Sequence, residues 1–139
     1  MRATLKTGRY NVGVGLLAMA GFMLYGFWLI YLRDLAPDRE AWIASYGVGK
    51  HFEARLAHVH GGLFALINLA LGFVLARLSE ASERARELAA ALGLAGLLMP
   101  IGILAEVYLN TSPVPVLIGA FAMTLSVGLS GVLSLRHWA

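Results

Sequence analysis

Polar side chains that could do chemistry are few in this largely apolar chain, and they occur in two places. His58 and His60 interrupt one apolar stretch, and Glu106 and Tyr108 lie near the end of another. An imidazole can bind a metal through a ring nitrogen, while a carboxyl or phenol group can donate or accept a proton. Because polar and ionisable groups are costly in apolar surroundings, these four residues are the first functional candidates.

The two histidines face different sides of a helix, because positions two apart are separated by about 200°. The face of His58 continues through mostly small residues, Gly61, Gly62, Ala65, Leu69 and Gly72. The face of His60 continues through bulky residues, Phe64, Ile67 and Leu71, with Asn68 to one side. A groove of small residues leaves space for a flat macrocycle, so we predict that His58 binds the iron of a haem, with His60 as the alternative. The contacts expected for the macrocycle are Gly61, Gly62 and Ala65.

Two other interpretations of these residues stay open. Small residues at three- and four-residue spacing are also the usual means of packing membrane helices closely, and a histidine at a helix end can bond a carbonyl group. A non-haem metal site that joins His58 or His60 to Glu106 is chemically possible, since zinc and iron accept nitrogen and oxygen ligands. The sequence has neither an HExxH motif nor a recognisable three-histidine ligand set to support it.

Composition predicts the elements that position these residues. Of the 139 residues, 59% are hydrophobic and 14% are charged, with a mean hydropathy of +0.73, whereas a soluble domain carries roughly 25% charged residues. Four apolar runs, at residues 12–32, 56–78, 88–109 and 114–135, reach the roughly 20 residues that a spanning helix needs. We expect one all-α domain over residues 1–139, an integral membrane four-helix bundle whose long outer loop, residues 33–53, contains a short interfacial helix. Pro100 should kink the third helix.

Basic residues predict how these helices cross the membrane. Seven of them flank the termini and the second loop: Arg2, Lys6, Arg9, Arg77, Arg84, Arg86 and Arg136. Four lie in or beside the first loop: Arg33, Arg39, Lys50 and Arg55. Because positive charge favours the cytoplasmic side, we predict an N-in/C-in protein of the inner (plasma) membrane. The net charge of +3 then reflects contact with membrane lipid and not binding of nucleic acid. This topology puts the two histidines at the depth of Glu106 and Tyr108, near the outer face.

No facing helix supplies a second axial histidine for the predicted haem. His51 falls in the first loop, and His137 lies at the opposite membrane face. A haem held by His58 should therefore be five-coordinate, or take a sixth ligand from water, substrate or another chain. An open iron position favours ligand binding or Lewis-acid chemistry over electron transfer. The absence of cysteine excludes disulfides, thiolate ligation and c-type haem attachment.

The chain resembles a known family in the spacing of its four apolar runs and in three local sequences. The three sequences are Ala57-His58 shortly after an arginine, Phe73-Val74-Leu75 downstream, and a tyrosine at the end of the third run before Ser112-Pro113. In these features the chain resembles the styrene oxide isomerases, which are small four-span membrane enzymes, over most of its length.

The resemblance implies a homotrimer in which His58 holds haem b at the subunit interfaces. In that family the ferric haem acts as a Lewis acid that opens an epoxide, which rearranges to an aldehyde, while a tyrosine and an asparagine position the substrate. Tyr108 takes the place of the tyrosine, or Glu106 does if the Ser-Pro sequence sets the register. The asparagine position is Phe64 in this chain, and Asn68 lies one turn further on, so the match supports the haem more than the reaction.

Two functions follow from these expectations. The first is a haem-dependent isomerase of small hydrophobic epoxides that enter from the membrane, with Tyr108, Glu106 and Asn68 as catalytic candidates. The second is a non-catalytic haem-binding protein or an accessory subunit of a respiratory complex, such as a nitric oxide reductase or a haem-copper oxidase. Both functions require a haem at His58.

Overall fold

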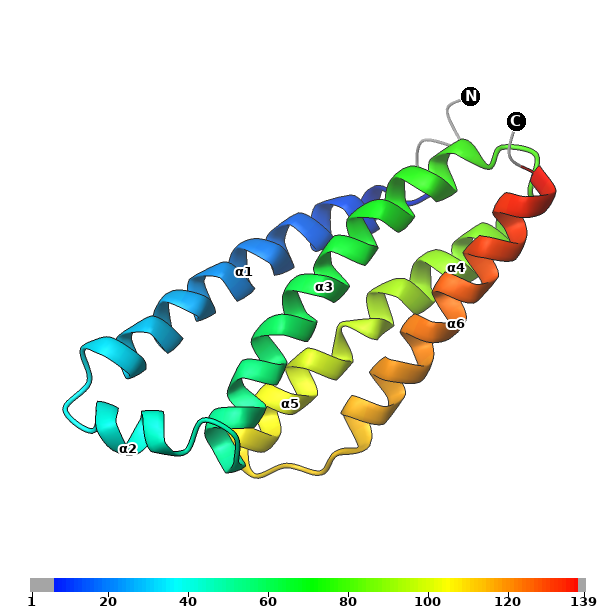
Figure 1. Ribbon diagram of the computed structural model, residues 1–139. Helices are drawn as coiled ribbons and strands as arrows, with labels where there is room; N and C mark the ends of the chain where they lie inside the picture. Colours follow the sequence, from blue (N-terminus) through cyan, green and yellow to red (C-terminus); the bar gives the residue numbers. More distant parts are fainter. Residues whose placement is uncertain (1–6, 138–139) are drawn as a thin grey trace.

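The computed structural model describes residues 7–137, and every regular element in that range is a helix (Figure 1). The helices, in chain order, are α1 (Arg9–Asp34), α2 (Arg39–Ala44), α3 (Gly49–Arg77), α4 (Glu83–Gly96), α5 (Leu98–Leu109) and α6 (Val114–His137). The all-α prediction is therefore confirmed for this range. Arg2 and Lys6, which contributed to the predicted orientation, lie outside the described residues.

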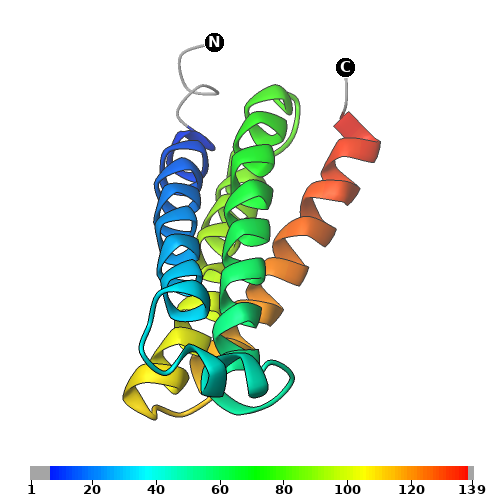
Figure 2. The ribbon, with the colours of Figure 1, turned by 60° about the vertical axis from the view of Figure 1, so that its left-hand side comes forward.

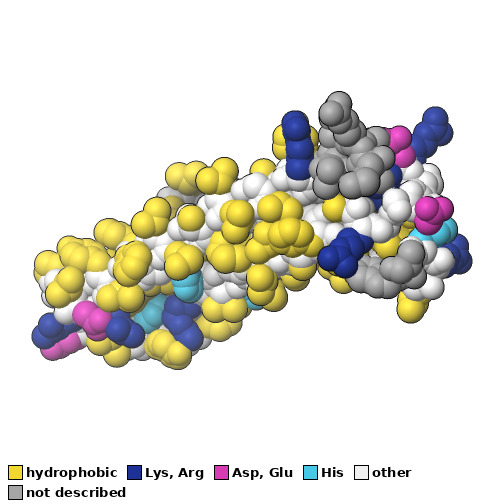
Figure 3. All heavy atoms as spheres, turned by 90° about the horizontal axis from the view of Figure 1, so that it is seen from above, with side chains coloured by type: hydrophobic (Ala, Val, Ile, Leu, Met, Phe, Trp, Pro, Cys, Tyr) yellow, Lys and Arg dark blue, Asp and Glu magenta, His cyan; other side chains and the backbone are white. Residues whose placement is uncertain are grey.

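Four helical segments are long and apolar enough to cross a membrane, namely α1, α3, α4 together with α5, and α6. α1 begins and α6 ends at one end of the bundle, and α2 lies at the other end (Figures 1 and 2). On the face in Figure 3, hydrophobic side chains cover the middle of the molecule and charged side chains gather at both ends. This is the arrangement of a multi-pass membrane helical bundle, as the four apolar runs predicted.

α3 extends further into the first loop than its apolar run predicted. It begins at Gly49, whereas the apolar run began at residue 56. Lys50, Glu53 and Arg55 are polar but are good helix formers, so hydropathy marked the spanning part of the helix and not its start. The loop predicted at residues 33–53 is therefore largely helical, and the expectation that His51 lies in a loop is wrong: it lies in α3.

The third span is interrupted at Leu97, which separates α4 from α5. Pro100 is the fourth residue after Gly96, so it cannot donate the backbone hydrogen bond that the Gly96 carbonyl would accept in a regular helix. The distortion expected from Pro100 is thus confirmed. Across this break α6 packs closely, with Gly119 directly against the backbone of Met99.

α1 and α3 pack closely through small residues. A Cβ atom on Gly15 of α1 would lie 2.9 Å from the carbonyl oxygen of Ala65 on α3. Nearer to α2, the ring of Phe22 fills the space over Gly61. The face of α3 that carries the small residues is therefore the face that α1 covers.

One buried polar cluster joins three of the helices. Asn11 of α1 and Asn68 of α3 are fully buried, and Nδ2 of Asn11 donates to Oδ1 of Asn68 at 2.9 Å. Both amides also donate to carbonyl groups of α4, Asn11 to Ala90 and Asn68 to Gly93. Because buried amide groups need hydrogen-bond partners, this cluster fixes α4 against α1 and α3.

Candidate functional site

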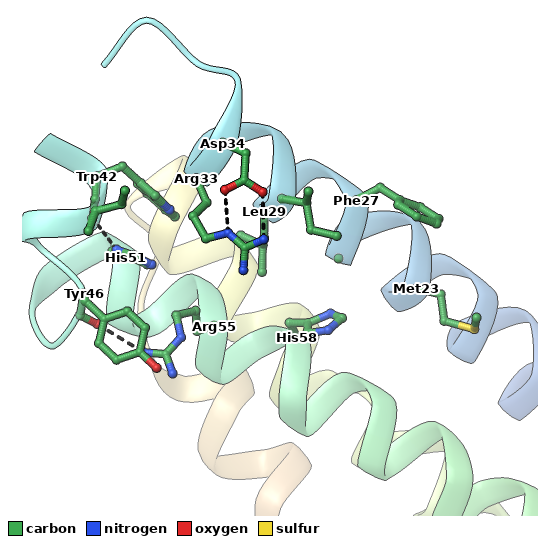
Figure 4. Close-up of a pocket in the computed structure, with 13 residues that line it drawn as sticks. Met23, Phe27, Leu29, Arg33, Asp34, Trp42, Tyr46, His51, Arg55 and His58 are labelled. Atoms are coloured by element: carbon green, nitrogen blue, oxygen red, sulfur yellow. Dashed lines mark hydrogen bonds and ion pairs between the residues drawn. The ribbon is translucent and has the colours of Figure 1, made fainter. Parts of the chain in front are cut away.

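A pocket lies between α1, α2 and α3, at the end of the bundle where α2 is found (Figure 4). Its volume of about 780 Å³ falls within the roughly 300–1,000 Å³ of small-molecule sites. α1 supplies an apolar wall that includes Met23, Phe27 and Ile30. The polar and aromatic groups come from the three helices and from the turn between α2 and α3, which contributes Tyr46; they are Arg33, Asp34, Trp42, Tyr46, His51, Arg55 and His58. The pocket thus suits a ligand with an apolar body and a few polar groups.

His58 lines this pocket, and its imidazole points from α3 toward α1 (Figure 4). The ring lies against Gly26, where an added Cβ atom would be 2.8 Å from Cε1 of the imidazole. Nδ1 of His58 is buried and has no hydrogen-bond partner in the described part of the chain. The glycine therefore leaves space for the imidazole, which packs against α1 without a hydrogen bond to it.

His60 occupies a different face of α3, as the two-residue spacing predicted. Its Nδ1 donates to the carbonyl oxygen of Leu56 one turn earlier, at 2.9 Å. Its ring lies edge-on to Phe64, with 6.2 Å between the ring centroids. His60 does not line the pocket described above, so the geometry favours His58 over His60 as the ligand-binding histidine.

The strip of small residues beyond His58 is a helix-packing surface. Phe22 of α1 fills the space over Gly61, and the backbone of Ala65 lies against Gly15. The open groove expected over Gly61 and Ala65 is therefore wrong, because α1 occupies it. Gly62 lies off this contact, with no atom within 4 Å of the position of an added Cβ. The space beside His58 lies instead toward α2, in the pocket.

Tyr25 connects His58 to Tyr108 across the bundle. The hydroxyl groups of Tyr25 and Tyr108 are 3.0 Å apart, within hydrogen-bond distance. The Tyr25 ring centroid lies 6.3 Å from that of the His58 imidazole. His58 and Tyr108 therefore both lie close to the Tyr25 side chain. Tyr25 was missed in the sequence, although it is a phenol beside Gly26 at a matching position in the first apolar run.

Glu106 lies two residues before Tyr108 on α5 and is not joined to either histidine. Its Oε1 is buried and has no hydrogen-bond partner among the described residues. Within residues 7–137 there is no group of three or more His, Asp or Glu side chains placed to hold a metal ion. The non-haem site that would join Glu106 to His58 or His60 therefore has no support from the geometry.

Asn68 does not belong to the pocket. It lies ten residues after His58 on α3, which corresponds to about 15 Å along the helix axis. Its Nδ2 donates to the carbonyl oxygens of Phe64 and Gly93, and its Oδ1 accepts from Asn11. The expectation that Asn68 positions a substrate beside His58 is wrong, because its amide holds α4 in place.

His51 brings a second imidazole to the pocket. Its Nδ1 donates to the carbonyl oxygen of Trp42, and its ring stacks on the indole with 4.0 Å between the centroids. His51 and His58 are seven residues apart on α3, or about 10.5 Å along its axis. While Trp42 holds the His51 ring in this position, the two imidazoles do not converge on one metal ion.

Two guanidinium groups lie at the pocket in different states of pairing (Figure 4). Arg33 forms an ion pair with Asp34, with 2.7 Å between nitrogen and oxygen. Arg55 lies over the ring of Tyr46, 3.5 Å from its centroid, and donates to the carbonyl oxygen of the same residue. No carboxylate pairs with Arg55 in the described range, so its charge is available to an anionic group of a ligand.

Comparison with known proteins gives no relative from which to transfer a function: no protein-family model matches the chain, and no curated protein or solved structure does either. The resemblance to the styrene oxide isomerases therefore depends on the local sequences quoted above. The features that indicate a function are the pocket, its imidazole without a hydrogen bond, and its two arginines.

Proposed function

We propose that this protein is a membrane-embedded haem b protein in which His58 is the ligand of the iron. One observation carries the proposal: the His58 imidazole lines a largely apolar pocket of about 780 Å³ and forms no hydrogen bond with the described residues. A buried ring nitrogen without a partner calls for an explanation, and imidazole is a common metal ligand. The geometry of His60, whose Nδ1 is bonded to its own helix, supports the choice between the two histidines.

The remaining pocket residues fit the other parts of a haem. Met23, Phe27 and Ile30 offer apolar surface to a macrocycle and keep water away from it. Arg55, which has no carboxylate partner in the described range, can donate charge-assisted hydrogen bonds to one of its carboxylates, and Arg33 could do so if it left Asp34. When bound, the haem would supply an iron able to act as a Lewis acid or in electron transfer.

The proposed membrane orientation and oligomeric state of the protein are inferred from its sequence. Seven basic residues against four favour an N-in/C-in protein of the inner (plasma) membrane. The pocket would then open toward the outer leaflet, where a small hydrophobic ligand can enter from lipid. The resemblance adds a homotrimer in which a neighbouring chain completes each haem site.

A second step of the proposal is that the protein rearranges small hydrophobic epoxides to carbonyl compounds. The observation in its favour is that His51 is held by Trp42, so that, of the two imidazoles that line the pocket, His58 alone would be free to hold the iron. Tyr25 and Tyr108 do not line the pocket, but the Tyr25 ring lies beside the His58 imidazole, and in this proposal a substrate bound next to His58 reaches their hydroxyl pair.

Incubating the haem-loaded protein with a panel of aryl and alkyl epoxides tests this step. An isomerase should release aldehyde from at least one of them, and Tyr108→Phe should slow the release by roughly 100-fold or more, because a positioned proton donor contributes about 10²–10⁴-fold. Haem binding without turnover of any epoxide would reject the isomerase. Co-purification with a nitric oxide reductase or haem-copper oxidase would then support the accessory role.

Gly26→Ala should weaken hemin binding by roughly tenfold, because a residue that orients a ligating histidine affects metal affinity on this scale. The added methyl group would lie 2.8 Å from Cε1 of His58 and would turn the imidazole away. Gly21→Ala is the matched control on α1, since nothing lies within 4 Å of its added methyl group. Spectroscopic titration with hemin measures both, and equal affinities for the two variants would contradict the placement of His58.

A further inference from the structure

Arg86 is a buried charge without a partner. Its exposed fraction is 4%, and neither Nε nor Nη1 has a hydrogen-bond partner in the described structure. The sequence placed Arg86 among the charges of the second loop, but it lies on the buried face of α4 with Ala89, Gly93 and Gly96. An unpaired guanidinium is costly to bury, so a group that supplies negative charge is expected beside it.

Ser130 is a second unpartnered polar group at the same level of the bundle. Its hydroxyl is buried on α6 and has no hydrogen-bond partner among residues 7–137. The antiparallel helices α4 and α6 are aligned by Ser126, whose hydroxyl donates to the Ala89 carbonyl at 2.6 Å. Arg86 comes three residues before Ala89, and Ser130 comes four residues after Ser126. Both therefore lie about one helical turn from this bond, toward the end where α4 begins and α6 ends.

This end of the bundle carries an excess of positive charge. Besides Arg86, its exposed arginines are Arg9, Arg77, Arg84 and Arg136, and its acidic residues are Glu80, Glu83 and Glu87. The ion pair found within residues 7–137 is Arg33–Asp34, at the opposite end. None of the three glutamates therefore forms an ion pair with Arg86. Because α4 begins at Glu83, one turn before Arg86, the unpaired guanidinium lies near the level expected of lipid headgroups.

We propose that Arg86 and Ser130 form a binding site for a phosphate group between α4 and α6. A guanidinium binds phosphate oxygens through two parallel hydrogen bonds, and a serine hydroxyl can donate a third. Basic pockets between membrane helices at this level are typical sites of phospholipid headgroups. The phosphate can come from an anionic phospholipid or from free phosphate, and the phospholipid is favoured because the site lies near headgroup depth in an apolar bundle.

Thermal unfolding of the delipidated protein in neutral detergent tests the site. Phosphatidylglycerol, phosphatidylcholine or inorganic phosphate is added to the unmodified protein, to Arg86→Gln and to Arg84→Gln. Arg84 is exposed and lies two residues away on α4, so its variant is the control with the same change in charge. Phosphatidylglycerol should raise the unfolding midpoint of the unmodified protein and of Arg84→Gln by roughly 5 °C, because a ligand stabilises the state that binds it. Arg86→Gln should show no rise.

Comparing the effects of phosphatidylglycerol, phosphatidylcholine and inorganic phosphate identifies the source of the phosphate. An equal rise with inorganic phosphate, lost in Arg86→Gln, assigns the site to free phosphate, and a rise restricted to phosphatidylglycerol assigns it to an anionic lipid. A rise of the same size in Arg86→Gln and in the unmodified protein overturns the proposal.

Two comparisons separate a binding site from a structural role. Without added lipid, Arg86→Gln should unfold at the same temperature as the unmodified protein or at a higher one, because the substitution removes an uncompensated buried charge. A lower midpoint would show that the chain itself satisfies Arg86, and would overturn the proposal. Ser130→Ala should reduce the lipid-dependent rise and leave the midpoint without lipid nearly unchanged.

Discussion

His58→Ala is expected to lower the affinity for hemin by about 100-fold or more, since even residues that only orient a metal ligand change affinity by about 10–100-fold. His60→Ala should keep nearly the full affinity, because the His60 ring bonds to its own helix and lies off the pocket. Titration of each purified variant with hemin, followed by the growth of a Soret band, gives the two affinities. The pair is matched, since each change removes one imidazole and the two positions are only two residues apart on α3.

His51→Ala completes this comparison. The His51 imidazole also lines the pocket, but its Nδ1 is bonded to the carbonyl oxygen of Trp42. Removing it should leave the Soret band in place, with at most a modest loss of affinity from the altered packing around Trp42. Loss of hemin binding in His51→Ala and its retention in His58→Ala would reverse the assignment of the ligand.

Gly119→Ala is expected to destabilise the protein by about 2 kcal/mol, the typical cost of inserting a methyl group where the core has no space. A Cβ atom at Gly119 of α6 would meet the backbone of Leu98 and Met99, at the break that Pro100 causes. A backbone cannot turn aside as the tip of a side chain can, so α6 and α5 would have to separate. Thermal or denaturant unfolding in detergent measures the loss.

Gly128→Ala is the matched control for that substitution. Gly128 lies on the same helix, and nothing lies within 4 Å of its added methyl group. In a helix interior alanine is favoured over glycine by about 1 kcal/mol, so this variant should be as stable as the unmodified protein or slightly more stable. Equal destabilisation by both substitutions would contradict the close approach of α5 and α6.

Much of the fold could be predicted from the sequence, because the length and hydropathy of a run report directly on the membrane. The four apolar runs became four spanning segments, and Pro100 produced the break at Leu97. The start of α3 could not be predicted from hydropathy, because its first two turns contain polar helix formers. That error placed His51 in a loop and hid its contribution to the pocket.

The candidate site was predictable only where the position of a side chain follows from the geometry of a single helix. The spacing of His58 and His60 is a local property of α3, and the two side chains do occupy different faces. Which helix covers the small residues is a property of tertiary packing, and here α1 covers Gly61 and Ala65. Tyr25 and Asn68 illustrate the same limit, because their roles depend on partners from helices distant in the sequence.

The proposed function depends on the pocket beside His58 binding haem, and the absorption spectrum of the purified protein during titration with hemin is its most direct test. We predict a Soret band that differs from that of free hemin in the same detergent and saturates at a fixed ratio of haem to protein. Protein that is colourless as purified, and that leaves the spectrum of added hemin unchanged, would contradict the proposed function. The phosphate site at Arg86 would be unaffected by that result.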